Sequence, residues 1–205
     1  IDELPQLFNV LAGQMSLGHA AFYGIGAYAS AIVTKTFGVP VIVGIVSAAV
    51  LCLVIGMLLS IPSFKLSGFY LSLVTISFGN IVWTVIVNWH ALTGGSLGLL
   101  GIQPIRIAGR ALTRTEFFYL SAAILALIYF VTTRIARSYI GRGLRAVRDD
   151  EMAAETAGID TKRLKLLVFS LSAIYAGIAG ALYAHLSTFL SPESRCALRA
   201  PVHVP

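Results

Sequence analysis

The chain has 205 residues, of which 57% are hydrophobic and 12% charged, and its mean hydropathy is +0.85. It carries 15 Lys and Arg residues against 9 Asp and Glu, which gives a formal net charge of +6. This composition excludes an ordinary soluble domain, which would interrupt its apolar segments with charge far more often. The basic residues lack interleaved aromatic residues, so they do not indicate a nucleic-acid partner.

Four long segments contain no charged residue: 4–34, 36–64, 66–104 and 166–192. Each exceeds the roughly 20 residues that a helix needs to cross a bilayer core of about 30 Å. The pattern predicts an all-α polytopic membrane protein, a bundle of about five complete transmembrane helices plus a short helix outside the membrane. In chain order, the predicted transmembrane helices are 17–34, 39–61, 66–88, 117–133 and 166–190.

The start of the chain precedes these helices. Residues 4–13 are apolar but too short to span a bilayer, and residue 1 is Ile rather than an initiator Met. No cleavable signal peptide is visible. We therefore expect a fragment that begins inside or just after a helix.

Small residues recur in the first and last predicted helices. In the last one they repeat at three- and four-residue spacing, as Ala176, Gly177, Gly180, Ala181 and Ala184. Hydrophobicity cannot drive helices together in lipid, so association there relies on close backbone approach and dispersion packing. The sequence predicts a compact bundle with close contacts along these helices.

Polar residues at membrane depth are costly, and they suggest a function by default. Two groups stand out: Gln14, Ser16 and His19 near the first helix, and Thr75, Ser77 and Asn80 in the third. They are candidates for lining a solute pathway, and the alternative is that they hydrogen-bond across helices or to backbone carbonyls.

Acid and base chemistry has little support within the predicted helices. These segments contain no acid–base pair for a proton relay, and the two Cys and four His residues show no metal-ligand spacing. We expect no catalytic residue, no metal and no cofactor in this chain, so energy for any pumping would come from another protein.

Basic residues predict how the chain is oriented. Eight lie between Arg134 and Lys165, against three in the 89–116 connection (Arg106, Arg110 and Arg114). Cytoplasmic loops carry the excess of Lys and Arg, so the 134–165 loop is predicted to be cytoplasmic. Helix alternation then places Lys65 in the cytoplasm and segments 35–38 and 89–116 outside. The glycine-rich segment 93–99 is predicted to be a flexible turn or re-entrant segment at the outer face.

The 134–165 loop is predicted to contain its own helix. Asp149 is a good N-cap, Asp150 and Glu151 place acids in the first turn, and Gly158 supplies a stop. Asp160 or Thr161 can then cap the last transmembrane helix. Such a helix can dock into a groove of a cytoplasmic partner. The alternative is a solvated connector whose basic residues bind anionic lipid.

Residues 141–159 resemble the cytoplasmic coupling loop of the branched-chain amino acid ABC transporter permeases. Glu151, Ala153, Ala154 and Gly158 match the Glu-Ala-Ala and later Gly pattern by which such importers engage their ATPase. Segments 13–28, 93–99 and 172–184 are also similar to that family, in the same order. The resemblance covers about residues 7 to 194 and is closest to the LivM-type subunit.

The resemblance implies a multi-pass subunit of a prokaryotic cell (inner) membrane. It would pair with a second permease subunit, two ATP-binding subunits inside and an extracytoplasmic solute-binding protein, and the solute would be leucine, isoleucine, valine or another small amino acid. Related permeases carry urea or short amides, and a membrane subunit that binds partners without transport is a further alternative. The residues assigned to ATPase coupling are Arg142, Arg145, Arg148, Asp149, Glu151, Ala153, Ala154 and Gly158.

The end of the chain departs from the family pattern. Residues 1–194 read as a permease transmembrane domain, incomplete at both ends, whereas 195–205 are basic and contain Pro where further apolar helices would follow. We expect this tail to reflect truncation or a shifted reading frame.

Overall fold

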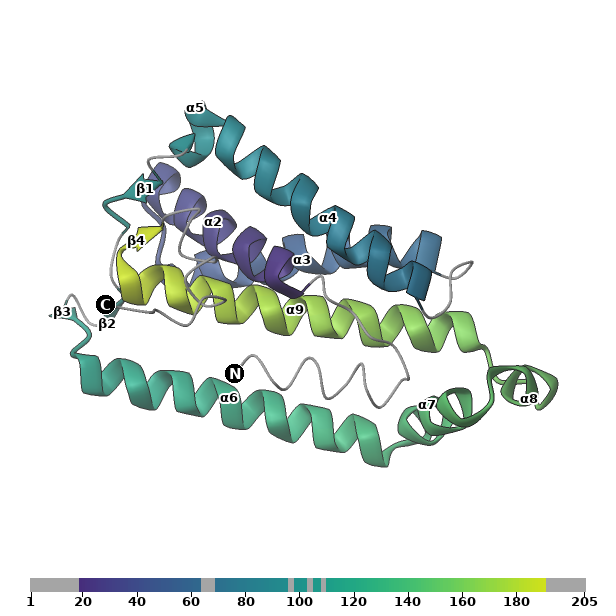
Figure 1. The fold of residues 1–205 in the computed structure, drawn as a ribbon. Coiled ribbons are helices and arrows are strands. Elements are labelled where there is room, and N and C mark those ends of the chain that lie inside the picture. Colours follow the sequence, from purple (N-terminus) through teal and green to yellow (C-terminus); the bar gives the residue numbers. More distant parts are fainter. Residues whose placement is uncertain (1–18, 64–68, 96–97, 103–104, 108–109, 191–205) are drawn as a thin grey trace, which may run out of the picture.

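The computed structural model describes residues 19–63, 69–95, 98–102, 105–107 and 110–190. Within them, long helices run back and forth as a bundle (Figure 1). The long helices are α2 (His19–Phe37), α3 (Val41–Ser63), α4 (Phe69–Asn88), α6 (Arg114–Arg137) and α9 (Thr161–Ser187). The shorter ones are α5 (His90–Thr93), α7 (Tyr139–Asp149) and α8 (Glu151–Thr156).

Two small antiparallel strand pairs accompany the helices, and the sequence did not predict them. The strands are β1 (Leu99–Leu100), β2 (Arg106–Ile107), β3 (Arg110–Ala111) and β4 (Phe189–Leu190). β1 pairs with β4, with Leu99 opposite Leu190, and β2 pairs with β3. The first pair joins the segment after α5 to the end of α9, residues that lie far apart in the chain.

The number of transmembrane helices is confirmed only in part. Three described segments are long and apolar enough to cross a membrane, namely Val41–Ser60 of α3, α6 and α9. The apolar part of α4, Leu73–Asn88, is shorter. All five predicted helices are present with shifted ends. Over the described residues, however, neither α2 nor α4 is both long and apolar enough to count as a membrane-crossing segment.

The centre of the bundle is formed by α2, α3 and α9, which pack through positions that have no side chain. A Cβ atom on Gly180 would lie 1.8 Å from the carbonyl oxygen of Tyr23, and one on Gly26 would lie 2.2 Å from that of Gly177. On the α3 side, a Cβ on Gly56 would lie 2.9 Å from the Cβ of Ala173. These distances confirm the predicted close approach of small-residue surfaces.

The attachment of α6 is looser. Its first half packs side chains such as Phe117 and Ile124 against a cluster formed by Val41, Ile105 and Leu182 of α9. Further along, the hydroxyl of Thr132 donates a hydrogen bond to Tyr175 Oη at 3.2 Å. The outer face of α6 exposes large apolar and aromatic side chains, including Tyr119 and Leu127, as expected for a surface that faces lipid.

The two ends of the bundle differ. α5 and the strands lie at one end, together with the turn between α2 and α3, whereas α7 and α8 project from the other (Figure 1). This arrangement agrees with the predicted alternation of the helices. Several predictions fall outside the described residues: those for segment 4–13, Gln14, Ser16, Lys65 and the tail 195–205.

Candidate functional site

Helix α7 (Tyr139–Asp149) is not among the elements predicted from the sequence, because its arginines fit a basic flank of the next helix. Its inner face buries Gly141, Leu144 and Val147 at three-residue spacing. Leu144 packs against Val168 of α9. The adjacent face, one residue further along at each turn, exposes Arg142, Arg145 and Arg148. Helix α7 therefore lies against α9 and presents a basic stripe outward.

The N-cap of α8 is Asp150, so the predicted cap at Asp149 is wrong by one residue. Asp149 is the last residue of α7, and Asp150 turns the backbone with φ −156° and ψ 112°. Its Oδ1 accepts hydrogen bonds from the backbone N–H groups of Met152 (2.9 Å) and Ala153 (3.0 Å). Only a residue in extended conformation can direct its side chain at these N–H groups, and Asp149 is held in helical conformation.

The predicted stop at Gly158 is confirmed. Gly158 has φ +80°, in the left-handed region that favours glycine. Its N–H donates to the carbonyl of Glu155 at 2.9 Å, and the N–H of Ile159 donates to that of Ala154 at 3.0 Å. This pair of bonds is a Schellman motif, and it reverses the chain so that α9 begins two residues later.

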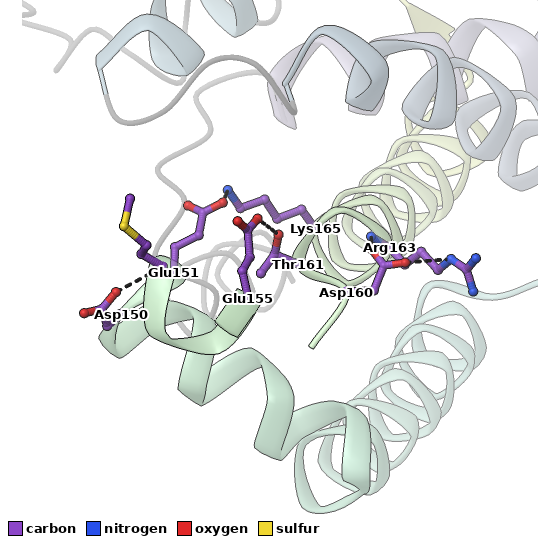
Figure 2. Close-up of polar contacts among 8 residues, drawn as sticks. Asp150, Glu151, Glu155, Asp160, Thr161, Arg163 and Lys165 are labelled. Carbon is purple, nitrogen blue, oxygen red and sulfur yellow. Dashed lines mark hydrogen bonds and ion pairs between the residues drawn. The ribbon is translucent and has the colours of Figure 1, made fainter. Parts of the chain in front are cut away.

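Helix α8 is held against the start of α9 by two side-chain contacts (Figure 2). Lys165 forms an ion pair with Glu151, and the hydroxyl of Thr161 donates to Glu155 Oε1 at 2.7 Å. Of the two residues predicted to cap α9, Asp160 and Thr161, it is Asp160 that does so, by accepting from the N–H of Arg163 at 3.1 Å. The ion pair is partly buried, with the Lys165 side chain 12% exposed and that of Glu151 44% exposed. The loss of hydration offsets much of the attraction in such a pair, so these contacts orient α8 more than they stabilise the fold.

The three residues of the Glu-Ala-Ala pattern have different environments. Glu151 contacts its own chain, Ala153 is exposed, and Ala154 is buried at 4% exposure. Beside Ala153, the Met152 side chain is 77% exposed. An exposed Met on a helix outside the bundle is a flexible apolar contact surface. Among the described residues, the side chains of Met152 and Ala153 are therefore exposed and form no polar contact of their own, while Glu151, although 44% exposed, is paired with Lys165 of α9.

A groove of about 310 Å³ lies at the same end of the bundle, between α7 and the turn into α9. Tyr139, Arg142 and Gly143 form one wall, and Gly158, Asp160 and Arg163 form the other. The Arg142 guanidinium lies 5.7 Å from the centroid of the Tyr139 ring. The groove and the basic stripe together give this end an indented, positively charged surface.

Inside the bundle, two histidine–serine hydrogen bonds join α2 to α9. His19 bonds to Ser172, and Ser30 bonds to His185 Nε2 at 2.9 Å. Ser30 and His185 are 0% and 2% exposed. His19 could be recognised as a candidate from the sequence, but its partner Ser172 could not, because more than 150 residues lie between the two members of each pair.

The polar residues predicted on α4 divide between two faces. Thr75 is 1% exposed, whereas Ser77 and Asn80 lie on the exposed side. Thr84 and Asn88, also exposed, continue the same stripe at four-residue spacing. The Thr84 hydroxyl donates to the Asn80 carbonyl at 2.9 Å, and the Asn88 amide to the Thr84 carbonyl at 2.8 Å. The structure thus places Thr75 in the interior and gives α4 a polar outer stripe.

Long apolar helices with a charged helical cap at one end define a polytopic helical membrane protein. The family model described as branched-chain amino acid transport system / permease component matches residues 4–202. The chain therefore belongs to that family, as the four motifs predicted.

The curated relatives are permease proteins. The chain is 34% identical to the high-affinity branched-chain amino acid transport system permease protein LivM of Escherichia coli (strain K12), over 90% of this chain and 49% of the relative. The Salmonella typhimurium protein of the same name shows the same identity and coverage. A probable branched-chain amino acid transport permease protein LivM of Methanocaldococcus jannaschii is 24% identical, over 89% of this chain and 59% of the relative. The chain thus spans about half the length of these relatives, and no solved structure matches it.

Proposed function

We propose that this chain is part of a membrane-spanning permease subunit of an ATP-driven importer for branched-chain or related small amino acids. It works with a second permease subunit, two ATP-binding subunits and an extracytoplasmic solute-binding protein, in a prokaryotic cell membrane. The observation that carries the proposal is the capped helix α8 at the charged end of the bundle, in a chain that belongs to the permease family. A short helix of this kind is suited to docking in a partner's groove.

The end that bears α7 and α8 faces the cytoplasm in this proposal. Eight basic residues between Arg134 and Lys165 support this orientation through the positive-inside bias. The opposite end, with α5 and the paired strands, then faces the solute-binding protein. Labelling of single cysteines with a membrane-impermeant reagent tests the orientation, because Ala153→Cys should react only from the cytoplasmic side.

The surface that contacts the ATP-binding subunits consists of Met152, Ala153 and the basic stripe Arg142, Arg145 and Arg148. The other coupling residues act indirectly. Asp149 ends α7, Glu151 binds Lys165, Ala154 packs inward and Gly158 reverses the chain. This division of roles is supported by the contacts within the chain, because Glu151 is held by Lys165, Ala154 is buried, and Gly158 adopts the left-handed backbone of the turn.

The polar outer stripe of α4 is proposed to line the solute pathway, through Ser77 and Asn80. Uncharged polar groups at membrane depth rarely face lipid. The Ser77 hydroxyl and the Asn80 amide can hydrogen-bond to the ammonium and carboxylate groups of an amino acid as it crosses the membrane. His19 and Thr75 are proposed to support the pathway from within, because His19 is bonded to Ser172 and Thr75 is buried.

Reconstitution of the complete transporter in proteoliposomes tests the function. Labelled leucine should accumulate with ATP, and labelled urea should not. Met152→Asp should reduce stimulation of ATP hydrolysis by the solute-binding protein about tenfold, because it places a charge on the apolar docking surface. Leu127→Met is the control, since Leu127 is exposed on α6, far from α8 in the fold. Accumulation of urea instead of leucine, or unchanged stimulation in Met152→Asp, contradicts the proposal.

A further inference from the structure

We propose that Lys165 and Thr161 are positioning residues that lock α8 to α9, so that movement of α8 passes to α2, α3 and α9 as one rigid body. The inference rests on the proposed coupling function. It assigns to Glu151 a role inside this chain, in place of the contact with the ATPase that the Glu-Ala-Ala pattern suggested.

The lock is a ladder with two rungs. Glu151 and Glu155 are four residues apart on α8, and Thr161 and Lys165 are four residues apart on α9, so each pair lies on one face of its helix. Glu151 pairs with Lys165, and Glu155 accepts from Thr161 (Figure 2). The rungs join the first residue of one helix to the fifth of the other in antiparallel order. Two rungs fix both the distance and the rotation of α8, which a single contact cannot do.

Backbone connections alone would hold α8 less firmly. The helix has six residues, and its buried side chain is Ala154. At its end, the left-handed Gly158 has open space around the position of a Cβ. Without the ladder, α8 could rotate about this turn when a partner pulls on it.

Beyond the ladder, α9 has no freedom to slide past α2 and α3. Gly177 faces Gly26, and a Cβ on Gly177 would lie 2.5 Å from Cys52 Sγ of α3. There is no room for even one added carbon between these helices, and packed interiors of this kind are bistable rather than continuously deformable. A displacement of α8 therefore reaches α2 and α3 through α9.

Lys165 is the better residue to substitute. Its side chain is 12% exposed, whereas that of Glu151 is 44% exposed. Removing Glu151 would leave an ammonium group largely shielded from water without its partner, and the fold itself could suffer. Removing Lys165 leaves a carboxylate that water can solvate. Lys165→Met keeps most of the aliphatic volume and removes only the rung.

The test measures leucine molecules moved per ATP hydrolysed by the complete transporter in proteoliposomes. Lys165→Met should lower this ratio at least fivefold while the ATP-binding subunits still copurify. The exchange Glu151→Lys with Lys165→Glu should restore it to within twofold. Thr161→Val should lower the ratio and Thr161→Ser should keep it, because Ser retains the hydroxyl. Lys162→Met is the matched control, since Lys162 is exposed one turn earlier, and it should leave the ratio unchanged.

A second measurement does not depend on transport. Spin labels at Thr156 of α8 and Val50 of α3, both exposed, should keep one distance with and without ATP in the wild type, and the distribution should broaden in Lys165→Met. The positioning role is wrong if Lys165→Met keeps the wild-type ratio, if the exchanged pair gives no recovery, or if the wild-type distance changes with ATP. These results leave the proposed function intact. A wild-type complex that moves no leucine with ATP overturns the proposed function, and the inference with it.

Discussion

Helix α9 makes contacts of two different kinds along its length. Between Ala173 and Gly180 it meets α2 and α3 through small residues, among them Gly177 and Gly180, which lack side chains. At its start, the hydroxyl of Thr161 and the ammonium group of Lys165 meet the carboxylates of Glu155 and Glu151 on α8. One helix therefore belongs to a close-packed bundle at one end and to a polar joint at the other.

The difference follows from the surroundings. In lipid, hydrophobicity gives no advantage to one apolar contact over another, so helices associate where backbones can approach closely. At the polar end, water competes for every hydrogen bond and each contact contributes about 1 kcal/mol or less. We infer that the bundle tolerates almost no added volume, whereas the joint depends on geometry more than on strength.

The largest expected effect is that of Gly180→Ala. The new Cβ would lie 1.8 Å from the Tyr23 carbonyl oxygen, a backbone atom that cannot rotate away. Forcing α2 and α9 apart should lower the free energy of unfolding by about 3 kcal/mol, measured by denaturation in mixed detergent micelles. Gly79→Ala is the control, since no atom lies within 4 Å of that Cβ position on α4. Equal stability of the two variants would remove the contrast between bundle and joint.

A smaller effect is expected for Gly158→Ala at the joint. The added Cβ meets no atom within 4 Å, but the left-handed backbone costs an L-residue roughly 1–2 kcal/mol. Gly158→Asn should cost less, because Asn tolerates this conformation. The same denaturation measurement separates the two variants. If Ala and Asn destabilise equally, the left-handed turn is not the source of the effect.

The hydrogen bond between Ser30 and His185 should contribute about 0.6 kcal/mol, the usual size for polar pairs between membrane helices. A double-mutant cycle with Ser30→Ala and His185→Leu measures it. The two single losses should sum to more than the loss of the double variant. Strict additivity would mean that the two side chains do not interact in the membrane.

The smallest effect is expected for Arg163→Gln. Its ion pair with Asp160 is exposed, with side-chain exposures of 89% and 50%, so the change should stay below about 0.5 kcal/mol. Asp160→Ala should cost more, about 1 kcal/mol, because it removes the N-cap of α9. The reverse order would show that the ion pair, and not the cap, stabilises the start of the helix.

Local patterns accounted for much of this structure. Charge-free segments predicted the long helices, Gly158 predicted the end of α8, and Asp160 was one of two residues predicted to cap α9. Each of these depends on residues within a few positions of one another. The error at Asp149 is also local, since two adjacent Asp residues can both cap a helix and only the backbone distinguishes them.

Other features could not be read from the sequence. The segment that forms α7 has the apolar spacing of an amphipathic helix in Leu144 and Val147, but its arginines fit an irregular basic connection equally well. The partner of Glu151 lies 14 residues away, across a chain reversal. On α4, the sequence placed Thr75 and Ser77 in one group, and only packing revealed that they face opposite ways.

The sequence by itself determined the membrane class, the family and the position of the helix outside the bundle, because these follow from composition, order of motifs and local caps. Only the tertiary structure decided that Glu151 faces α9 and that Gly180 meets Tyr23. It also decided which polar residues of α4 point outward. Those facts depend on contacts between residues distant in the chain, and their geometry is set when all the helices pack at once.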